Sequence, residues 1–244
     1  MAPAPVATAV ALVLGAGLLA AAPRLSARTQ VSAARSSGEE SGWHRLFDGR
    51  TLNGWKATGN KAAGWAVEEG AIACLANGGG YLYTTEPFQD FVLRGEFKVN
   101  PRVNSGIFLR WSDLRDPVNT GIEIQVLDSF GRVKPERHDC GAIYDILAPS
   151  FDATRPAGEW NPIEITADGP ILRVVLNDQQ IAEADLREWT TPHQNPDGSR
   201  NKFQYAYNTM THPGHIGLQD HGGRCWYRNL QIKSLRPWSP PVHG

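Results

Sequence analysis

From Trp43 onward, short apolar and polar runs alternate along the chain, and glycine, proline, asparagine and aspartate break these runs. Alternation with a period of two residues is typical of β-strands that bury one face. Turn signals such as Asp168-Gly169-Pro170 and Asn177-Asp178 separate neighbouring runs. The pattern predicts strands at 64–68, 71–75, 81–84, 88–99, 105–111, 120–127, 141–146, 163–168, 171–176, 179–184, 215–219 and 226–235.

Helical periodicity is missing, apart from a short turn predicted at 185–189. Without helices to cover a parallel sheet, we expect an all-β fold, one antiparallel jelly-roll β-sandwich. The longest stretch without a predicted strand, 188–215, is rich in proline, asparagine, glycine and threonine. Long irregular segments in compact domains are often functional, so we predict a functional loop there.

The beginning of the chain has a different character. Residues 6–22 are almost wholly small and apolar, and arginines and a polar stretch follow them. This order indicates a signal peptide, with an uncleaved anchor as the alternative. We expect a signal or apolar segment at 1–27, a polar linker at 28–42, one domain at 43–236 and a tail at 237–244. The predicted location is the periplasm, the cell envelope or the extracellular space, with no membrane domain beyond the N-terminal segment.

Composition narrows the function classes. The 24 Lys and Arg residues nearly balance the 25 Asp and Glu residues, for a formal net charge of -1. Such a chain lacks the basic surface that nucleic-acid binding needs, so no nucleic-acid partner is expected. Cys74, Cys140 and Cys225 allow at most one internal disulfide, and three buried thiols fit the sequence equally well.

Three predicted strands place large polar groups on one face. Alternation sets Ile107 and Leu109 on one side of their strand, with Asn104 and Arg110 on the other. The same argument separates polar from apolar positions in 121–126 and 217–221. If these strands are neighbours in one sheet, their polar side chains form a single polar surface made of Arg110, Glu123, Gln125, Gln219 and His221. A solvated outer face would give the same alternation. Arginine, glutamine and histidine near glycine and tryptophan favour a sugar-binding cleft instead.

A second group, Glu159, Trp160 and Asn161, offers an acid, an aromatic ring and an amide just before a strand. The ring could stack on a sugar and the amide could bond its hydroxyls, although a strand-entry turn with a core tryptophan explains the same residues. His212 and His215 lack the carboxylate motif that would complete a zinc signature. The sequence also has no nucleophile elbow or phosphate-binding loop.

Several segments together resemble the 3-keto-disaccharide hydrolase domain family. The resemblance covers about 43–235 and rests on a set of motifs in order: 46–55, 104–110, 123–128, 141–144, 156–161, 195–198, 201–203 and 217–222. It implies a concanavalin A-like sandwich of the lectin and glucanase type. It also implies an exported enzyme that acts on glycosides already oxidised at C3, with an oligosaccharide or glycoside as its substrate.

The motif at 123–128 bears on the chemistry. A retaining glucanase of this sandwich type would carry E-x-D-x-x-E on one strand, whereas this chain has Glu123-Ile124-Gln125-Val126-Leu127-Asp128. The middle acid is an amide, and the last acid is one methylene shorter than glutamate. The close carboxylate pair of a retaining enzyme is therefore not expected here.

A 3-keto sugar allows another route, in which a base removes the C2 proton and the glycosidic oxygen leaves from C1. Water then adds to give net hydrolysis. His221 fits the base by its ordinary pKa, and Glu123 is the rival if burial raises its pKa. Arg110 could hold the enolate oxygen. Gln125, Gln219, Glu159, Trp160, Asn161 and Asn104 are the expected substrate-binding residues.

No cofactor is required by the sequence, but a divalent metal could stabilise the enolate in place of Arg110. Glu123, His138 and His221 are its candidate ligands. Three other functions stay open: a non-catalytic lectin-like module, an ordinary glycoside hydrolase acting on unoxidised glucan, and a structural envelope protein.

Overall fold

A computed structural model describes residues 42–59, 62–77 and 80–236 of the chain. All of them belong to one compact unit, Glu39–Gly244. The predicted signal segment, most of the linker and the C-terminal tail lie outside the described residues. None of the helices in the described segments is long and apolar enough to cross a membrane.

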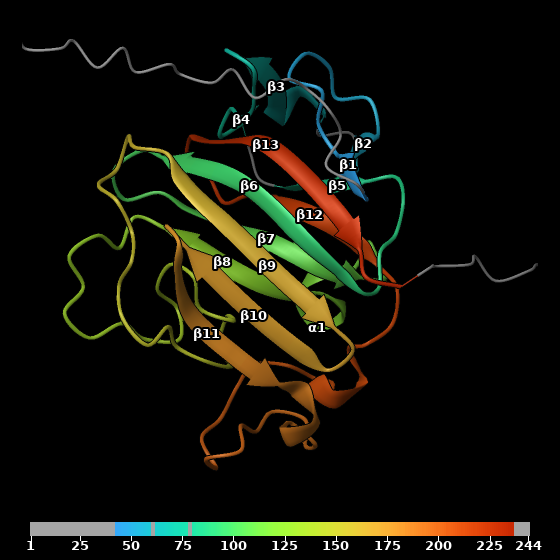
Figure 1. Ribbon diagram of the computed structural model, residues 1–244, viewed down its shortest axis with the longest axis vertical. Coiled ribbons are helices and arrows are strands. Elements are labelled where there is room, and N and C mark those ends of the chain that lie inside the picture. The colour runs from blue at the N-terminus through green and yellow to red at the C-terminus, as the bar shows by residue number, and fades with distance from the viewer. Residues whose placement is uncertain (1–41, 60–61, 78–79, 237–244) are drawn as a thin grey trace, which may run out of the picture. The chain divides into compact units, whose positions relative to one another are not determined.

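Two antiparallel sheets form the fold, as predicted (Figure 1). The larger has eight strands in the order β11-β10-β9-β6-β13-β4-β3, with β1 also paired to β13. Its members are β1 (Trp43–Arg45), β3 (Trp65–Glu68), β4 (Ala71–Cys74), β6 (Phe91–Val99), β9 (Asn161–Asp168), β10 (Ile171–Leu176), β11 (Gln179–Asp185) and β13 (Cys225–Ser234).

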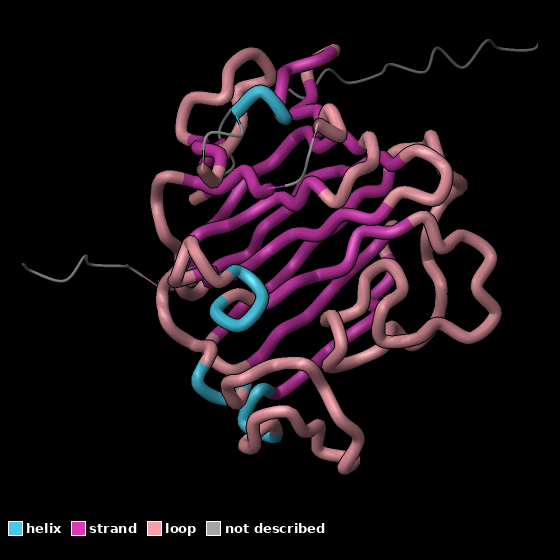
Figure 2. Tube along the Cα trace, turned by 180° about the vertical axis from the view of Figure 1, so that it is seen from behind, coloured by secondary structure: helices cyan, strands magenta, loops and turns pink. Residues whose placement is uncertain are grey.

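The smaller sheet has five strands in the order β2-β5-β12-β7-β8. They are β2 (Trp55–Ala57), β5 (Gly80–Thr84), β7 (Asn104–Trp111), β8 (Ile122–Leu127) and β12 (His215–Asp220). Figure 2 looks onto this sheet, with the short helix α1 (Pro117–Thr120) in front of it. Three 3-10 turns complete the structure: η1 (Ala62–Gly64), η2 (Leu186–Glu188) and η3 (Tyr207–Thr209).

Alternating apolar side chains from both sheets fill the space between them. On β6 every second residue is buried, from Phe91 to Val99, and the intervening positions are partly exposed. On β8 the inward residues Ile122, Ile124 and Val126 are fully buried. Burial of this apolar surface is the main force that holds the sheets together. All three cysteines are buried as free thiols.

Two expectations about elements need correction. The predicted strand 141–146 is not one: Ile143 makes only isolated bridges, to Ile124 and to Leu147. A left-handed residue at Asp145, with φ of 61°, turns the backbone away from extended geometry. The three-residue strands β1 and β2 and the helix α1 were not predicted, because each is too short to show a period.

Candidate active site

The outward face of the five-stranded sheet carries two neighbouring rows of side chains. In the first row Tyr81 pairs with Gln219, and Gly106 pairs with Gln125. Because Leu218 pairs with Ile107 in the ladder between them, Gln219 lies beside Gly106. The predicted neighbourhood of Gln125 and Gln219 is therefore present in the structure.

The second row places Glu123 opposite Phe108, which pairs in turn with Gly217. The Glu123 carboxylate extends from the second row to Gly106 in the first row, since a Cβ atom added to Gly106 would lie 2.5 Å from Oε1 of Glu123. A glycine at position 106 thus makes room for the carboxylate between the two glutamines.

Glu123 lies in a strongly desolvated position. Its exposed fraction is only 6%. Burial raises the pKa of Glu123 to about 7, and the positive charge of Lys202 partly opposes this rise. A carboxyl with a pKa near neutrality can take up and release protons at physiological pH.

Three tyrosines surround this carboxyl. Burial raises the pKa of Tyr81, Tyr144 and Tyr207, and the charge of Glu123 raises each further. Tyr144 comes next to β8, since its backbone N–H donates to the carbonyl of Glu123 over 2.9 Å. The Lys202 ammonium lies 4.0 Å from the centre of the Tyr144 ring.

Several buried polar atoms on or near this face have no hydrogen-bond partner among the described residues: Asn104 Oδ1, Gln125 Oε1, Gln219 Oε1 and the Tyr207 hydroxyl. The two glutamines are oriented through their amide nitrogens. Gln125 donates to the carbonyl of His138 over 3.0 Å, and Gln219 donates to the Tyr81 hydroxyl over 3.4 Å. Unpaired buried acceptors are costly, so an arrangement that leaves them free suits a ligand with hydroxyl donors.

Arg110 does not join this face. The register between β7 and β12 shifts next to it, and Arg110 itself adopts a left-handed φ of 51°. This bulge makes Arg110 the extra residue and turns Trp111, instead of Arg110, to the outward face. The prediction from simple alternation was therefore wrong at this residue.

The Arg110 guanidinium is fully buried and already paired. It donates to the carbonyls of Gln89, Gly169 and Met210 and to the Asp90 carboxylate, at 2.7 to 3.1 Å. Burial lowers its pKa to about 10, although Asp90 opposes the shift. Arg110 therefore joins segments of the fold, and its donors are not free for a substrate.

The group Glu159, Trp160 and Asn161 also lies apart from Glu123. Asn161 is buried, with its side chain bonded to Arg155, Glu159 and Asn177, and Glu159 is exposed. Trp160 lies on the outward face of the other sheet, where Lys98 and Arg228 sit over its ring. It lines a separate hollow of about 450 Å³.

The two candidate histidines, His221 and His138, lie at different places. His221 is exposed and directly follows β12, on the same sheet as Glu123. His138 packs its ring 4.7 Å from that of Tyr144, and its Nε2 lies 3.0 Å from Asp145 Oδ1. Within the described ranges, no group of three or more His, Cys, Asp or Glu side chains could hold a metal ion. The divalent metal that the sequence analysis left open as an alternative to Arg110 stays untested.

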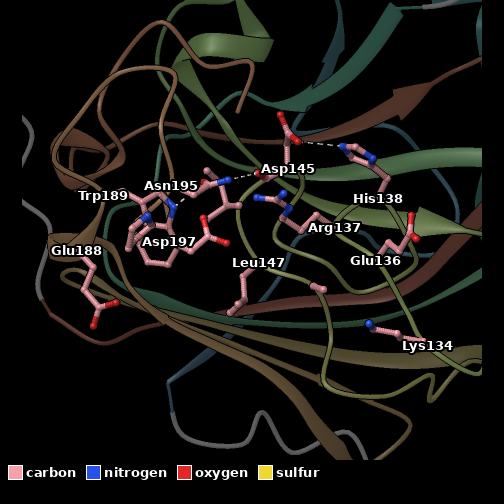
Figure 3. Close-up of a pocket in the computed structure, with 13 residues that line it drawn as sticks. Lys134, Glu136, Arg137, His138, Asp145, Leu147, Glu188, Trp189, Asn195 and Asp197 are labelled. Atoms are coloured by element: carbon pink, nitrogen blue, oxygen red, sulfur yellow. Dashed lines mark hydrogen bonds and ion pairs between the residues drawn. The ribbon is translucent and has the colours of Figure 1, made fainter. Parts of the chain in front are cut away.

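A cavity of about 740 Å³ lies beside this site, at the loops that follow β8 and η2 (Figure 3). His138 and Asp145 form part of its wall. Tyr144 lies between these two residues and Glu123, because it contacts both the His138 ring and the β8 backbone.

Sequence reasoning missed Tyr81, Tyr144, Lys202 and Tyr207. The alternation in Gly80-Tyr81-Leu82-Tyr83 could have placed Tyr81 on the outward face. Lys202 and Tyr207 come from the long segment between β11 and β12, where no periodic pattern indicates which way each side chain points.

The fold is an antiparallel β-sandwich whose five-stranded sheet carries a polar outward face. Comparison with family models matches residues 42–233 to the 3-keto-alpha-glucoside-1,2-lyase-like domain. The chain belongs to this family.

Individual relatives agree with that assignment. A 3-keto-disaccharide hydrolase of Bacteroides thetaiotaomicron is 29% identical over 228 residues, which are 80% of this chain and 79% of the relative. A solved candidate glycosyl hydrolase from Parabacteroides distasonis is 31% identical, with a TM-score of 0.71, over 79% of this chain and 99% of that one. The transglycosylase Crh5, at 12% identity and a TM-score of 0.52 over 81% of this chain and 86% of its own, shares the fold alone.

Proposed function

We propose that this protein cleaves the glycosidic bond of 3-keto glycosides by removing the proton on C2 of the oxidised sugar. The observation that carries the proposal is Glu123, a buried carboxyl with a pKa of about 7 on a polar face in a chain of this family. The oxidised ring would lie on the Glu123 carboxylate, which occupies the space that Gly106 leaves free.

The reaction follows from the acidity of a C–H bond next to a ketone. The Glu123 carboxylate takes the C2 proton, and the electron pair of the C–H bond becomes an enolate with the C3 oxygen. The enolate then expels the glycosidic oxygen, the C1–O bond breaks, and the leaving oxygen takes up a proton. Addition of water to the resulting double bond completes a net hydrolysis.

Charge develops on the C3 oxygen during this step and needs a donor. Since Arg110 is occupied elsewhere, we assign this role to the Lys202 ammonium and the Tyr207 hydroxyl. Both lie close enough to Glu123 to interact with its charge. The free amide oxygens of Asn104, Gln125 and Gln219 would accept hydrogen bonds from the sugar hydroxyls and fix the ring.

Between the two predicted bases, burial favours Glu123. A base that is shielded from water keeps the abstracted proton in the site, and a pKa near 7 balances ionisation against basicity. His221 is exposed, so we expect His221→Ala to retain turnover and Glu123→Gln to lose it.

The test is product release from the purified protein with methyl 3-keto-glucoside and with methyl glucoside as the unoxidised control. Each reaction runs with and without a metal chelator. We expect methanol only from the keto sugar, and loss of release in the chelator arm would add a metal to the site. Release from neither sugar, with glycan binding retained, would identify a lectin-like module. Equal release from both would identify an ordinary glycoside hydrolase.

A further inference from the structure

Two of the three cysteines face each other across a pair of strands in the eight-stranded sheet. Cys74 on β4 and Cys225 on β13 are direct partners in the antiparallel ladder (Figure 1). Residues opposite each other in such a ladder have Cα atoms about 4.5 or 5.5 Å apart and side chains on the same face. Disulfide bonds span Cα distances of about 4.4 to 6.8 Å. The backbone therefore already has the spacing that a cross-strand disulfide needs.

The two sulfur atoms also lie next to each other in the interior. Cys74 and Cys225 are fully buried, and the row continues on either side with the buried residues Trp65 and Val99. Each thiol changes the pKa of the other. Hydrogen bonding to Cys225 raises the pKa of Cys74, and hydrogen bonding to Cys74 lowers the pKa of Cys225. The two side chains thus point toward each other and not into separate parts of the core.

The surroundings of the pair can accommodate oxidation. The Cys225 thiol donates to the Ser105 hydroxyl over 3.5 Å, and a disulfide would remove this donor. Ser105 Oγ donates to the carbonyl of Gln219 over 2.6 Å and lies 2.7 Å from the Tyr227 hydroxyl. The Tyr227 hydroxyl can therefore supply the proton that Ser105 accepts. No buried polar group loses its partner when the S–H bond is gone.

The third cysteine belongs to a different part of the molecule. Cys140 lies in the loop that follows β8, where its backbone N–H donates to the Ser129 hydroxyl over 3.2 Å. Burial raises the pKa of Cys140 to about 12, with smaller effects from Leu127 and from nearby acids. Neither of the other two thiols contributes to this shift. The structure thus separates one pairing from the three that the sequence allows.

We infer that Cys74 and Cys225 form a disulfide bond when the chain folds in the presence of a disulfide oxidant, and that Cys140 stays a free thiol. The predicted export of the chain would bring it to a compartment in which such bonds persist. The inference does not depend on the proposed function, because the pair takes no part in the proton transfer to Glu123.

Oxidised glutathione is a sufficient oxidant for this bond. The thiolate of one cysteine attacks a sulfur of oxidised glutathione and displaces one glutathione thiolate. The second cysteine thiolate attacks the resulting mixed disulfide at the protein sulfur and displaces the other. Two electrons and two protons pass from the cysteine pair to glutathione. Because both thiols are buried in the native protein, this exchange has to take place before the sandwich closes.

The experiment counts thiols after refolding. Purified protein is reduced and unfolded in urea, then refolded with a mixture of reduced and oxidised glutathione. Free thiols are titrated with dithionitrobenzoate in denaturant, and mass spectrometry of a digest identifies the linked peptides. Cys140→Ala is the matched control, because it removes the cysteine that the inference leaves free. Cys74→Ala and Cys225→Ala each remove one member of the pair.

We expect the thiol count of the wild type to fall from three to one, with Cys74 and Cys225 in the linked peptides. Cys140→Ala should fall from two thiols to none, whereas Cys74→Ala and Cys225→Ala should keep both of theirs. Three free thiols in the refolded wild type, or a bond that contains Cys140, would overturn the inference.

Urea unfolding provides a second readout that needs no variant. The bond closes the chain from residue 74 to residue 225 into one loop, and a long loop restricts the unfolded chain strongly. We expect reduction with dithiothreitol to lower the midpoint of the oxidised protein by about 1 M urea. A midpoint that is no higher in the oxidised protein would also overturn the inference, because the bond would then not fit the native sheet.

Discussion

Gly106 and Glu123 depend on each other at the centre of the site. The carboxylate occupies the space that a side chain at position 106 would need. The backbone of Gly106 lies in strand β7 outside the left-handed region, so its conformation does not exclude alanine. The three atoms nearest to an added Cβ all belong to Glu123. The Glu123 side chain, and not the backbone conformation, is thus the reason for a glycine at position 106.

Gly106→Ala tests that dependence. The new methyl group should displace the Glu123 carboxylate, and misplacement of a reacting group by about 1 Å can cost about 100-fold in rate. We expect kcat on a 3-keto glycoside to fall by about that factor, while circular dichroism and the unfolding midpoint change little. Unchanged kcat would show that the carboxylate does not need this position.

Glu123→Gln tests the raised pKa of Glu123 through protein stability, with no need for an activity assay. Burial keeps Glu123 protonated at pH values where the same carboxyl in the unfolded chain has ionised. The free energy of unfolding of the wild type should therefore fall as pH rises from 4.5 to about 7. Glutamine cannot ionise, so the variant should be more stable at pH 8, by about 3 kcal/mol at most.

This difference should vanish below pH 4.5, where both states of the wild type are protonated. Urea unfolding at pH 4 and pH 8 measures it. A variant that is less stable than the wild type at pH 8 would show that the carboxylate is well solvated or paired in the native protein.

At the scale of strands, the sequence predicted most of the sandwich but not its irregular points. Alternation located most of the longer strands, because one-sided burial imposes a period of two. It also placed Glu123, Gln125 and Gln219 on one face. It failed at Arg110, because one extra residue in a ladder reverses every later side chain.

The bulge predicts a structural role for Arg110. Arg110→Met leaves the carbonyls of Gln89, Gly169 and Met210 without this donor, while Asp90 keeps Arg236 and the backbone N–H of Gly169. A buried acceptor that loses its donor typically costs about 1–3 kcal/mol. We expect a lower unfolding midpoint in urea, together with nearly unchanged kcat in the fraction that remains folded. Full stability with lost turnover would instead return Arg110 to the catalytic site.

Across the whole molecule, the two sheets present different outward faces. The face of the five-stranded sheet carries Glu123 with free amide oxygens, whereas the other carries Trp160 and Trp226 with Lys98 over both rings. Residue types alone could not separate these faces, since which strands are neighbours depends on the topology of the whole chain.

Trp160→Ala tests this separation. The ring contacts Lys98 and Arg228 on the sheet opposite the proposed chemistry. We expect kcat and KM on a 3-keto disaccharide to stay within twofold of the wild type. A large rise in KM would place Trp160 in the substrate path after all.

The central claim is that cleavage begins with loss of the C2 proton to Glu123. Its most direct test is kcat/KM for methyl 3-keto-glucoside with hydrogen or deuterium at C2, measured across pH on wild type and Glu123→Gln. We predict slower cleavage of the deuterated sugar, a wild-type rate that rises with pH through about 7, and no turnover by the variant. Equal rates for both isotopes, with turnover retained in Glu123→Gln, would contradict the account.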